Sequence, residues 1–392
     1  MKQVAIVAAK RTAIGSFAGS LATVSADQLG AEVIRQLIVD TGIAADTVGE
    51  VIMGQVLAAG QGQNPARKAA LNAGLPNTCL AMTINKVCGS GLKAVCLGAQ
   101  SIMLGDLDII IAGGQENMSQ SGHILLGSRD GFGMGNASLV DTMLKDGLTD
   151  TFGGYHMGVT AENVARQFAI SREEQDVFAA ESQKKAFKAR AEGRFENEIV
   201  SVLVRKRKAD LVEFKMDEFI RDGVCLEDLE KLRPAFEKTG TVTAGNSSGI
   251  NDGAAAVMLM SVERAESLGL PILAKVVAFA SAGVDPEIMG TGPIPATKKC
   301  LEKSGWIHQD LDLVEANEAF ASQAIGVNVG MGWDVSKVNV NGGAIAIGHP
   351  IGASGCRVLV SLIHEMIKRD ARKGLATLCI GGGQGIALAI ER

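Results

Sequence analysis

Two stretches far apart in the chain share one pattern, and this constrains the fold more than any other feature. Gly89-Ser90-Gly91 precedes a segment of helical periodicity and an apolar strand-like run that closes on Gly113-Gly114-Gln115. Ala353-Ser354-Gly355 precedes a second such segment and run, which closes on Gly382-Gly383-Gln384. Two matched units of turn, helix, strand and turn indicate that the core was built twice.

This duplication bears on two residues of chemical interest. Cys88 lies just before the first unit, and His349 lies shortly before the second. In two equivalent halves these residues occupy equivalent corners. We therefore expect them to face one cleft.

Strand-like runs alternate with helix-like segments through most of the chain. Residues 4–9 form an apolar run, and the capping-box pattern that starts at Ser25 predicts a helix that ends near Gly42. Residues 81–84 form another run just before Cys88. This alternation predicts an α/β fold built in layers.

The pattern changes in the middle of the chain. Residues 119–249 hold more polar helices and loops, including a helix that begins with a capping box at Ser171. We interpret them as an inserted loop domain. Residues 1–118 together with 250–270 then form an N-terminal half, and residues 271–392 form a C-terminal half.

Composition excludes several classes of protein. The formal net charge of the 392 residues is −5, and the basic run Arg205-Lys206-Arg207-Lys208 is too short to follow a nucleic acid backbone. Seven cysteines without close CxxC pairs argue against both a disulfide framework and a zinc site. No apolar stretch is read as a membrane span or a secretory leader. We expect a cytoplasmic enzyme that holds no metal.

Cys88 is the first candidate for a reactive group. It follows a strand-like run and comes just before a helix, with glycines beside it. Free N–H groups and the partial positive charge of a helix N-terminus favour a thiolate, and so a nucleophile. A buried structural cysteine is the alternative, which fits Cys96 on the apolar helix face.

Three further residues have both a chemical and a structural interpretation. His349 lies in a glycine-rich turn suited to proton transfer, or it caps a helix. Cys379 ends a strand before three glycines whose N–H groups can bind an oxyanion, or it is a core thiol. Asn317 holds a water or a substrate, or it is a helix N-cap.

Four blocks that contain these residues together resemble the thiolase family. They come in that family's order and approximate spacing, and weaker matches extend the resemblance over nearly the whole chain. The segment Tyr155-His156-Met157-Gly158 is most similar to the family's bacterial biosynthetic branch. The four blocks are Cys88-Gly89-Ser90-Gly91, Asn317-Glu318-Ala319-Phe320, Gly348-His349-Pro350-Ile351-Gly352-Ala353-Ser354-Gly355 and Cys379-Ile380-Gly381-Gly382-Gly383.

The resemblance implies a fold and a reaction. Two α/β halves form a five-layered α-β-α-β-α core, and the loop domain binds coenzyme A. Cys88 is acetylated by acetyl-CoA while His349 takes its proton. Cys379 then deprotonates a second acetyl-CoA, and acetoacetyl-CoA and coenzyme A result. His349 and a water held by Asn317 are expected to stabilise the enolate oxygen, and the backbone N–H groups of Cys88 and Gly381 to stabilise the tetrahedral acyl intermediate.

The resemblance also implies a set of contacts and an assembly. Coenzyme A thioesters are substrates, no cofactor is needed, and the family is usually tetrameric. Met289 is expected to line the acyl pocket. The residues expected against coenzyme A are Leu148, His156, Met157, Arg221, Phe236, Ala244, Ser248 and Phe320.

Three other functions compete with this prediction. A decarboxylating ketoacyl synthase shares the fold but commonly pairs its cysteine with two histidines, or with His and Asn, so Cys379 favours a thiolase. A degradative thiolase acts on longer chains. A silent acyl-CoA-binding relative would have lost a reactive group, yet Cys88, His349, Asn317 and Cys379 are all present.

Overall fold

The computed structural model describes residues 2–205 and 210–392. Three residues of the basic run at 205–208 lie outside this part of the chain.

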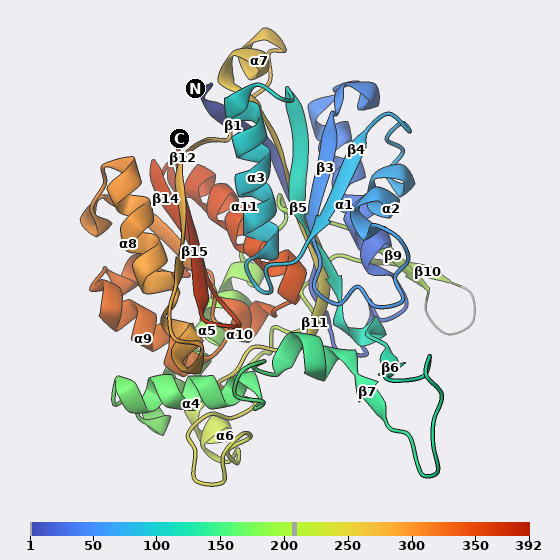
Figure 1. Cartoon of the computed structure of the whole chain (residues 1–392). Coiled ribbons are helices and arrows are strands. Elements are labelled where there is room, and N and C mark those ends of the chain that lie inside the picture. Colours follow the sequence, from blue (N-terminus) through green and yellow to red (C-terminus); the bar gives the residue numbers. More distant parts are fainter. Residues whose placement is uncertain (1, 206–209) are drawn as a thin grey trace.

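One large sheet runs through the molecule, and its strand order divides it into two halves (Figure 1). Five strands of the first half follow one another, then four of the second, and the halves meet where β1 pairs with β12 over only three residues. In spatial order the strands are β13 (Leu313–Ala316), β14 (Lys373–Ile380), β15 (Gln384–Glu391), β12 (Ala274–Gly283), β1 (Val4–Thr12), β11 (Asn251–Ser261), β5 (Ile109–Asn117), β3 (Glu50–Gly54) and β4 (Leu80–Ile84). The short strands β2 (Gly15–Ser16) and β8 (Ile199–Val200) pair with β11 and β1.

Helices fill three layers around the two halves of this sheet (Figure 1). The central layer holds α3 (Ser90–Leu104) and α11 (Ile351–Arg369). One outer layer holds α1 (Ala26–Thr41) and α2 (Pro65–Asn72), and the other holds α8 (Pro293–Ser304) and α9 (Ala321–Met331). Separate apolar clusters lie on the inner and outer faces of the strands. The predicted five-layered α/β fold is confirmed.

Helix α3 is also long and apolar enough to be a membrane-span candidate by composition. The 18 residues Val87–Leu104 are long and apolar enough to cross a membrane by length and composition alone. However, its residues Leu92, Val95 and Ile102 are fully buried in the central cluster together with Val358 of α11. The apolar character of α3 is therefore accounted for by its place between the two halves of the sheet.

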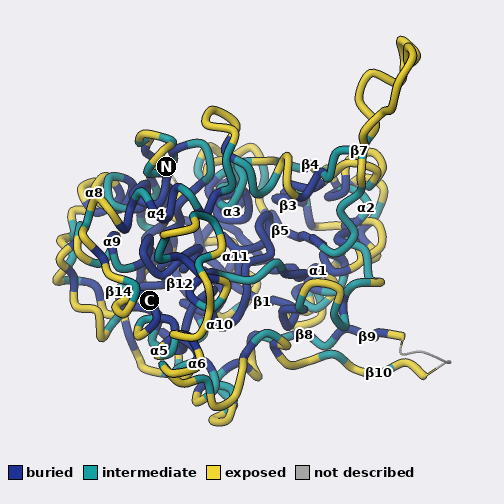
Figure 2. The backbone as a smooth tube through the Cα atoms, turned by 90° about the horizontal axis from the view of Figure 1, so that it is seen from below, coloured by how far each residue is buried: buried dark blue, intermediate teal, exposed yellow. Residues whose placement is uncertain are grey.

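The middle of the chain leaves the sheet after β5 and returns to it at β11. Figure 2 shows the connection between β6 and β7 as an exposed loop that projects from the body. The elements are β6 (His123–Leu125), β7 (Leu139–Asp141), a π-helical turn at Met143–Leu148, α4 (Met157–Gln167), α5 (Arg172–Ala191), β9 (Val202–Arg205), β10 (Leu211–Phe214) and α6 (Leu226–Glu230). Two short helices, α7 (Val262–Ser267) and α10 (Ala344–Ile347), follow β11. The domain boundaries at 118, 249 and 270 stay predictions.

Helix ends follow the sequence signals. The backbone N–H of Ser25 donates to the side chain of Gln28, and α1 ends at Gly42, whose φ is +64°. The side chain of Ser171 accepts from the backbone N–H of Glu174 at the start of α5. These local signals set helix bounds without help from tertiary contacts.

The predicted turns of the repeat are wrong in three places. Ser90 and Gly91 lie in the first turn of α3, Ala353, Ser354 and Gly355 lie inside the first turns of α11, and Gly113 and Gly114 lie inside β5. Close packing of backbone against backbone, rather than a turn, explains the glycines at these positions. A Cβ on Gly114 would lie 2.1 Å from the carbonyl oxygen of Gly352. Glycine is needed there because β5 passes directly beneath the start of α11.

Candidate active site

A cavity of about 400 Å³ lies where the ends of the central helices meet the loop segment. It is bounded by residues of both halves and of residues 119–249. Most of the predicted site residues share this one cavity. Its lining includes Cys88, Leu148, His156, Met157, Arg221, Phe236, Ala244, Ser248, Met289, Phe320, His349 and Gly381.

Cys88 lies in a tight turn between β4 and α3. Its neighbour Val87 has a φ of +48°, which is unusual for a β-branched residue. Ser90 holds the turn, since its hydroxyl donates to the carbonyl of Val87 at 2.6 Å and accepts from the N–H of Lys86 at 2.8 Å. Sequence reasoning missed the roles of Val87, which adjoins the block Cys88-Gly89-Ser90-Gly91, and of Ser90, which belongs to it. The turn fixes the direction of the Cys88 thiol.

The resting state of Cys88 differs from the expected thiolate. Burial raises the pKa of the Cys88 thiol to about 11, while the backbone N–H groups of Gly381 and of Cys88 act in the opposite direction. Loss of solvation therefore outweighs the local dipoles. At neutral pH the residue is a thiol, so its use as a nucleophile requires a base.

His349 is fixed beside the cavity and is uncharged. Its backbone N–H donates to Oδ1 of Asn251 at 2.8 Å, and its Nδ1 lies 2.6 Å from the hydroxyl of Ser354. Burial, with a smaller effect of Arg357, lowers the pKa of His349 to about 3. A neutral imidazole is the form that can accept a proton. The capping alternative does not describe this residue, because Pro350 precedes α11.

Cys379 approaches the same site from the other half. It lies near the end of β14 and is fully buried against Met157, Met289 and Phe320. Burial raises the pKa of its thiol well above the usual range, and the nearby Cys88 raises it further. Met157, Met289 and Phe320 line the cavity, and Cys379 packs behind them. Cys379 therefore lies near Cys88 but does not itself line the cavity.

Asn317 has an unusual environment. It is 1% exposed, yet among residues 2–205 and 210–392 neither the nitrogen nor the oxygen of its side-chain amide has a hydrogen-bond partner. The N-cap alternative is wrong, because α9 begins at Ala321 and is preceded by Phe320. A buried amide with no protein partner requires a polar group from outside the chain, such as a water. The expected role of Asn317 in holding a water stays a prediction, and Asn317 itself does not line the cavity.

Aromatic rings form the wall that is expected to hold coenzyme A. The ring of His156 stacks on Phe236 at 4.6 Å between centroids, and Phe236 meets Phe320 edge to face at 6.1 Å. At the exposed mouth the guanidinium of Arg221 lies over the ring of Phe219, 5.2 Å from its centroid. A stacked apolar wall with a cation at its rim suits a flat group that carries phosphates.

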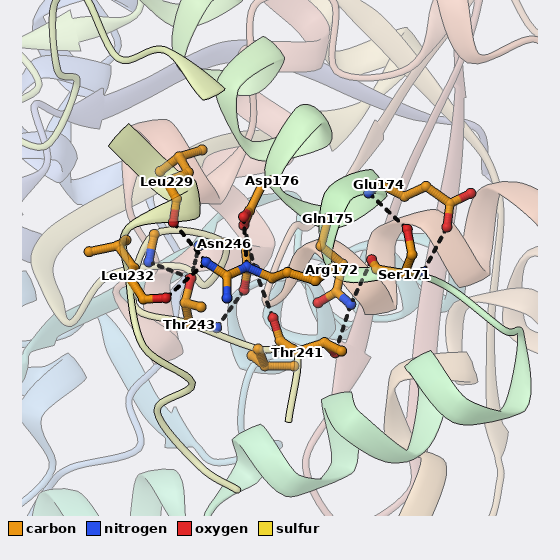
Figure 3. A network of polar contacts seen from close by, with 12 residues as sticks. Ser171, Arg172, Glu174, Gln175, Asp176, Leu229, Leu232, Thr241, Thr243 and Asn246 are labelled. Carbon is orange, nitrogen blue, oxygen red and sulfur yellow. Dashed lines mark hydrogen bonds and ion pairs between the residues drawn. The ribbon is translucent and has the colours of Figure 1, made fainter. Parts of the chain in front are cut away.

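A polar network behind this wall holds it in place (Figure 3). Asp176 of α5 accepts from Arg172 at 2.6 Å and from the amide of Asn246 at 2.8 Å. Gln175 donates to the hydroxyl of Thr241 at 2.9 Å. Residues 241–246 are thereby fastened to α5 next to Ala244 and Ser248 of the lining. Sequence reasoning did not find these anchors, because single polar residues on a helix carry no signal of their partners.

Glu116 links the two halves at the base of the site. Its carboxylate accepts from the backbone N–H groups of Val56, Leu57 and Gly352 at 2.8–3.1 Å. Burial raises its pKa to about 7. It thus ties the loop after β3 to the start of α11, within two residues of Pro350.

Comparisons with known proteins agree over the whole chain. The sequence model "Thiolase, N-terminal domain" matches residues 4–263, and "Thiolase, C-terminal domain" matches residues 270–392. An acetyl-CoA acetyltransferase of Chromobacterium violaceum is 64% identical over 390 residues, all of both chains.

Two solved structures are similar as well. The crystal structure of the Bacillus anthracis acetyl-CoA acetyltransferase has a TM-score of 0.98 at 44% identity, and it covers 100% of this chain and 99% of its own. Human mitochondrial 3-ketoacyl-CoA thiolase has a TM-score of 0.96 at 40% identity, with coverage of 100% and 98%.

Fold and sequence together define an acyltransferase enzyme. The chain belongs to the thiolase family.

Proposed function

We propose that this protein is an acetyl-CoA acetyltransferase. It condenses two molecules of acetyl-CoA to acetoacetyl-CoA and coenzyme A, and it catalyses the reverse thiolysis. Full-length relatives at 58–64% identity that are named acetyl-CoA acetyltransferase support this activity. The structural observation that supports it most is that Cys88 and His349 line one cavity, while Cys379 lies near Cys88 behind the cavity wall formed by Met157, Met289 and Phe320.

The first half of the reaction acetylates Cys88. Neutral His349 accepts the thiol proton, the sulfur attacks the thioester carbon, and coenzyme A leaves. Splitting the reaction into two such steps is covalent catalysis. The backbone N–H groups of Cys88 and Gly381 point to where the oxyanion of this step would lie.

The second half forms the carbon–carbon bond. Cys379 removes a proton from the methyl group of a second acetyl-CoA, and the resulting carbanion attacks the acetyl-cysteine. The enolate oxygen is stabilised by a water on Asn317 and by His349 in the state in which Nε2 carries a proton. Each such donor contributes about 3 kcal/mol to lowering the barrier.

The cavity favours short acyl groups. Met157, Met289 and Phe320 are buried and pack around Cys379, which leaves little room beyond an acetyl or acetoacetyl group. A broader 3-ketoacyl-CoA thiolase is the alternative, in view of the human mitochondrial relative. Turnover with acetoacetyl-CoA compared with longer 3-ketoacyl-CoA substrates separates the two.

The proposal extends to cofactor, assembly and location. Both the nucleophile and the carbon base are thiols, so the reaction needs no resident cofactor. Exposed apolar side chains on the β6–β7 loop, among them Leu126, Phe132 and Met134, support self-association, with a homotetramer as the expected state. The expected compartment is the cytoplasm.

Mass spectrometry after acid quenching tests the function directly. One acetyl group is expected on the peptide that contains Cys88 after exposure to acetyl-CoA, and none in Cys88→Ala. Acetylation of Cys88→Ala at the same level, or none in the wild type, would refute the proposed nucleophile.

A further inference from the structure

We propose that Ser354 is a positioning residue that sets the tautomer of His349. In this arrangement the proton of the neutral imidazole is on Nδ1, and the lone pair of Nε2 faces the Cys88 thiol. This inference rests on the proposed function, in which Cys88 is the nucleophile and His349 its base.

The hydrogen bonds of Ser354 leave one consistent assignment of protons. Its Oγ lies 2.8 Å from the carbonyl oxygen of Pro350 and 2.6 Å from Nδ1 of His349. A carbonyl oxygen can only accept, and a hydroxyl has a single proton. Two oxygens at 2.8 Å without a proton between them would repel, so the hydroxyl donates to Pro350. The lone pairs of Oγ are then left for Nδ1, which must therefore be the donor.

Both ends of this contact are rigid. Ser354 is fully buried inside α11, and its hydroxyl is bound to the carbonyl of the helix start. On the other side, the backbone N–H of His349 is bound by Asn251, whose amide in turn donates to the carbonyl of Gly15 at 3.0 Å. The backbone of His349 is thus held by Asn251, and its ring is held by Ser354.

The remaining nitrogen is directed to the chemistry. His349 lines the cavity together with Cys88, and within residues 2–205 and 210–392 the hydrogen bonds give Nε2 no protein partner. With Nδ1 protonated, Nε2 has a free lone pair. The S–H bond of Cys88 breaks, an N–H bond forms at Nε2, and the electron pair stays on sulfur for attack on the thioester.

A hydroxyl suits this task better than a carboxylate would. The hydroxyl accepts from Nδ1–H but carries no charge, so it orients the imidazole without increasing the affinity of Nε2 for the transferred proton. His349 can therefore release that proton readily to coenzyme A or to the enolate oxygen. The charged groups near the pair are Arg357 on α11, which acts on His349, and Glu116 on β5, which acts on Cys88. Cys379 on β14 faces Cys88 as a second thiol.

Alkylation of Cys88 by iodoacetamide, followed by mass spectrometry from pH 6 to pH 10, tests the role of Ser354. In Ser354→Ala the Nδ1 donor loses its acceptor, and part of the imidazole carries its proton on Nε2. We expect alkylation at pH 7 to be about 10-fold to 100-fold slower than in the wild type. The difference should narrow as pH rises, because direct ionisation of the thiol then replaces the base.

Ser361→Ala is the matched control. Ser361 is also a buried serine of α11, and its hydroxyl donates to Glu198 at 3.0 Å, away from His349. The Ser361→Ala variant should lose about as much stability as Ser354→Ala, and its Cys88 should be alkylated with the same dependence on pH as in the wild type. The proposal is overturned if alkylation of Cys88 in Ser354→Ala is slowed by the same factor at every pH, or if it is not slowed at pH 7.

A second measurement needs no variant of Ser354. In protein labelled with ¹⁵N-histidine, the two nitrogens of the His349 ring, assigned through His349→Gln, should show Nδ1 protonated and Nε2 bare at pH 7. The opposite pattern overturns the inference even if Cys88 becomes acetylated. Failure of acetylation with the expected pattern would instead count against the proposed function alone.

Discussion

Gly91 of α3 and Gly355 of α11 each face the backbone of the other helix. A Cβ on Gly355 would lie 2.4 Å from the backbone nitrogen of Leu92, and a Cβ on Gly91 would lie 2.8 Å from that of Cys356. The first turns of the two helices therefore cross in close contact. This crossing brings Cys88, just before α3, to the same end of the core as His349, just before α11.

Substitution Gly355→Ala should therefore lower stability. No side chain can be accommodated without moving α3, and overpacking of this kind costs about 1–3 kcal/mol. Urea unfolding measures the change. Gly122→Ala is the control, because a Cβ there meets nothing within 4 Å. Equal stability of the two variants would contradict the close crossing.

Removal of the second thiol should separate the two half-reactions. Cys379→Ala is expected to be acetylated on Cys88 by acetyl-CoA but to form acetoacetyl-CoA at least about 100-fold more slowly, because the carbon base is missing. Quenched mass spectrometry and a condensation assay measure the two steps on the same sample. Normal condensation by this variant would exclude Cys379 as the base.

Met289→Ala should relax the preference for short chains. The side chain is 3% exposed and packs with Met157 and Phe320 around Cys379. Its truncation opens space for roughly three more carbons, and each buried methylene contributes about 0.8 kcal/mol. We expect kcat/KM for 3-ketohexanoyl-CoA to rise relative to acetoacetyl-CoA. An unchanged ratio would place the limit on chain length elsewhere.

Asp176→Asn tests the anchor of the cavity wall. An amide in place of the carboxylate presents a donor to either Arg172 or Asn246, both of which are donors, so one hydrogen bond is lost and residues 241–246 should loosen. If the anchored conformation of this segment is destabilised by about 1–3 kcal/mol, the KM for acetoacetyl-CoA should rise about 5-fold to 100-fold, with a smaller effect on kcat. Glu181→Gln, which alters an exposed pair with Lys184 on the same helix, should change neither constant.

The neutral imidazole of His349 predicts a dependence of stability on pH. Its pKa in the folded protein is lowered from 6.5 to about 3, so between these values the unfolded chain binds a proton that the folded protein does not. The contribution of neutral His349 to the free energy of unfolding is complete above pH 6.5. It is lost as the pH falls below that value, by at most about 1.4 kcal/mol per pH unit. Glu116, whose folded pKa is raised to about 7, acts in the opposite direction between pH 4.5 and 7.

A comparison with His349→Gln isolates the histidine, because both proteins keep Glu116. Urea unfolding of the two at several pH values from 5 to 7 should show the wild type losing stability relative to the variant as pH falls. Parallel curves would mean that His349 is hydrated and free to ionise.

Local sequence signals determined the elements and the identity of the reactive groups. The capping patterns at Ser25 and Ser171 fix helix starts through hydrogen bonds within one turn, so they need no tertiary context. The repeat around Gly91 and Gly355 indicated a duplicated core, although it did not reveal that these glycines lie inside helices. The residues at the cavity followed from a resemblance carried by four short blocks.

Only the tertiary structure decided how those groups behave. The sequence places Cys88 before a helix and so favours a thiolate, yet burial among residues distant along the chain raises its pKa and keeps the thiol protonated. The contact of Ser354 with His349 and the anchors of residues 241–246 on α5 likewise depend on packing. Solvation and hydrogen-bond geometry are set by residues distant along the chain, and a linear pattern does not contain their distances.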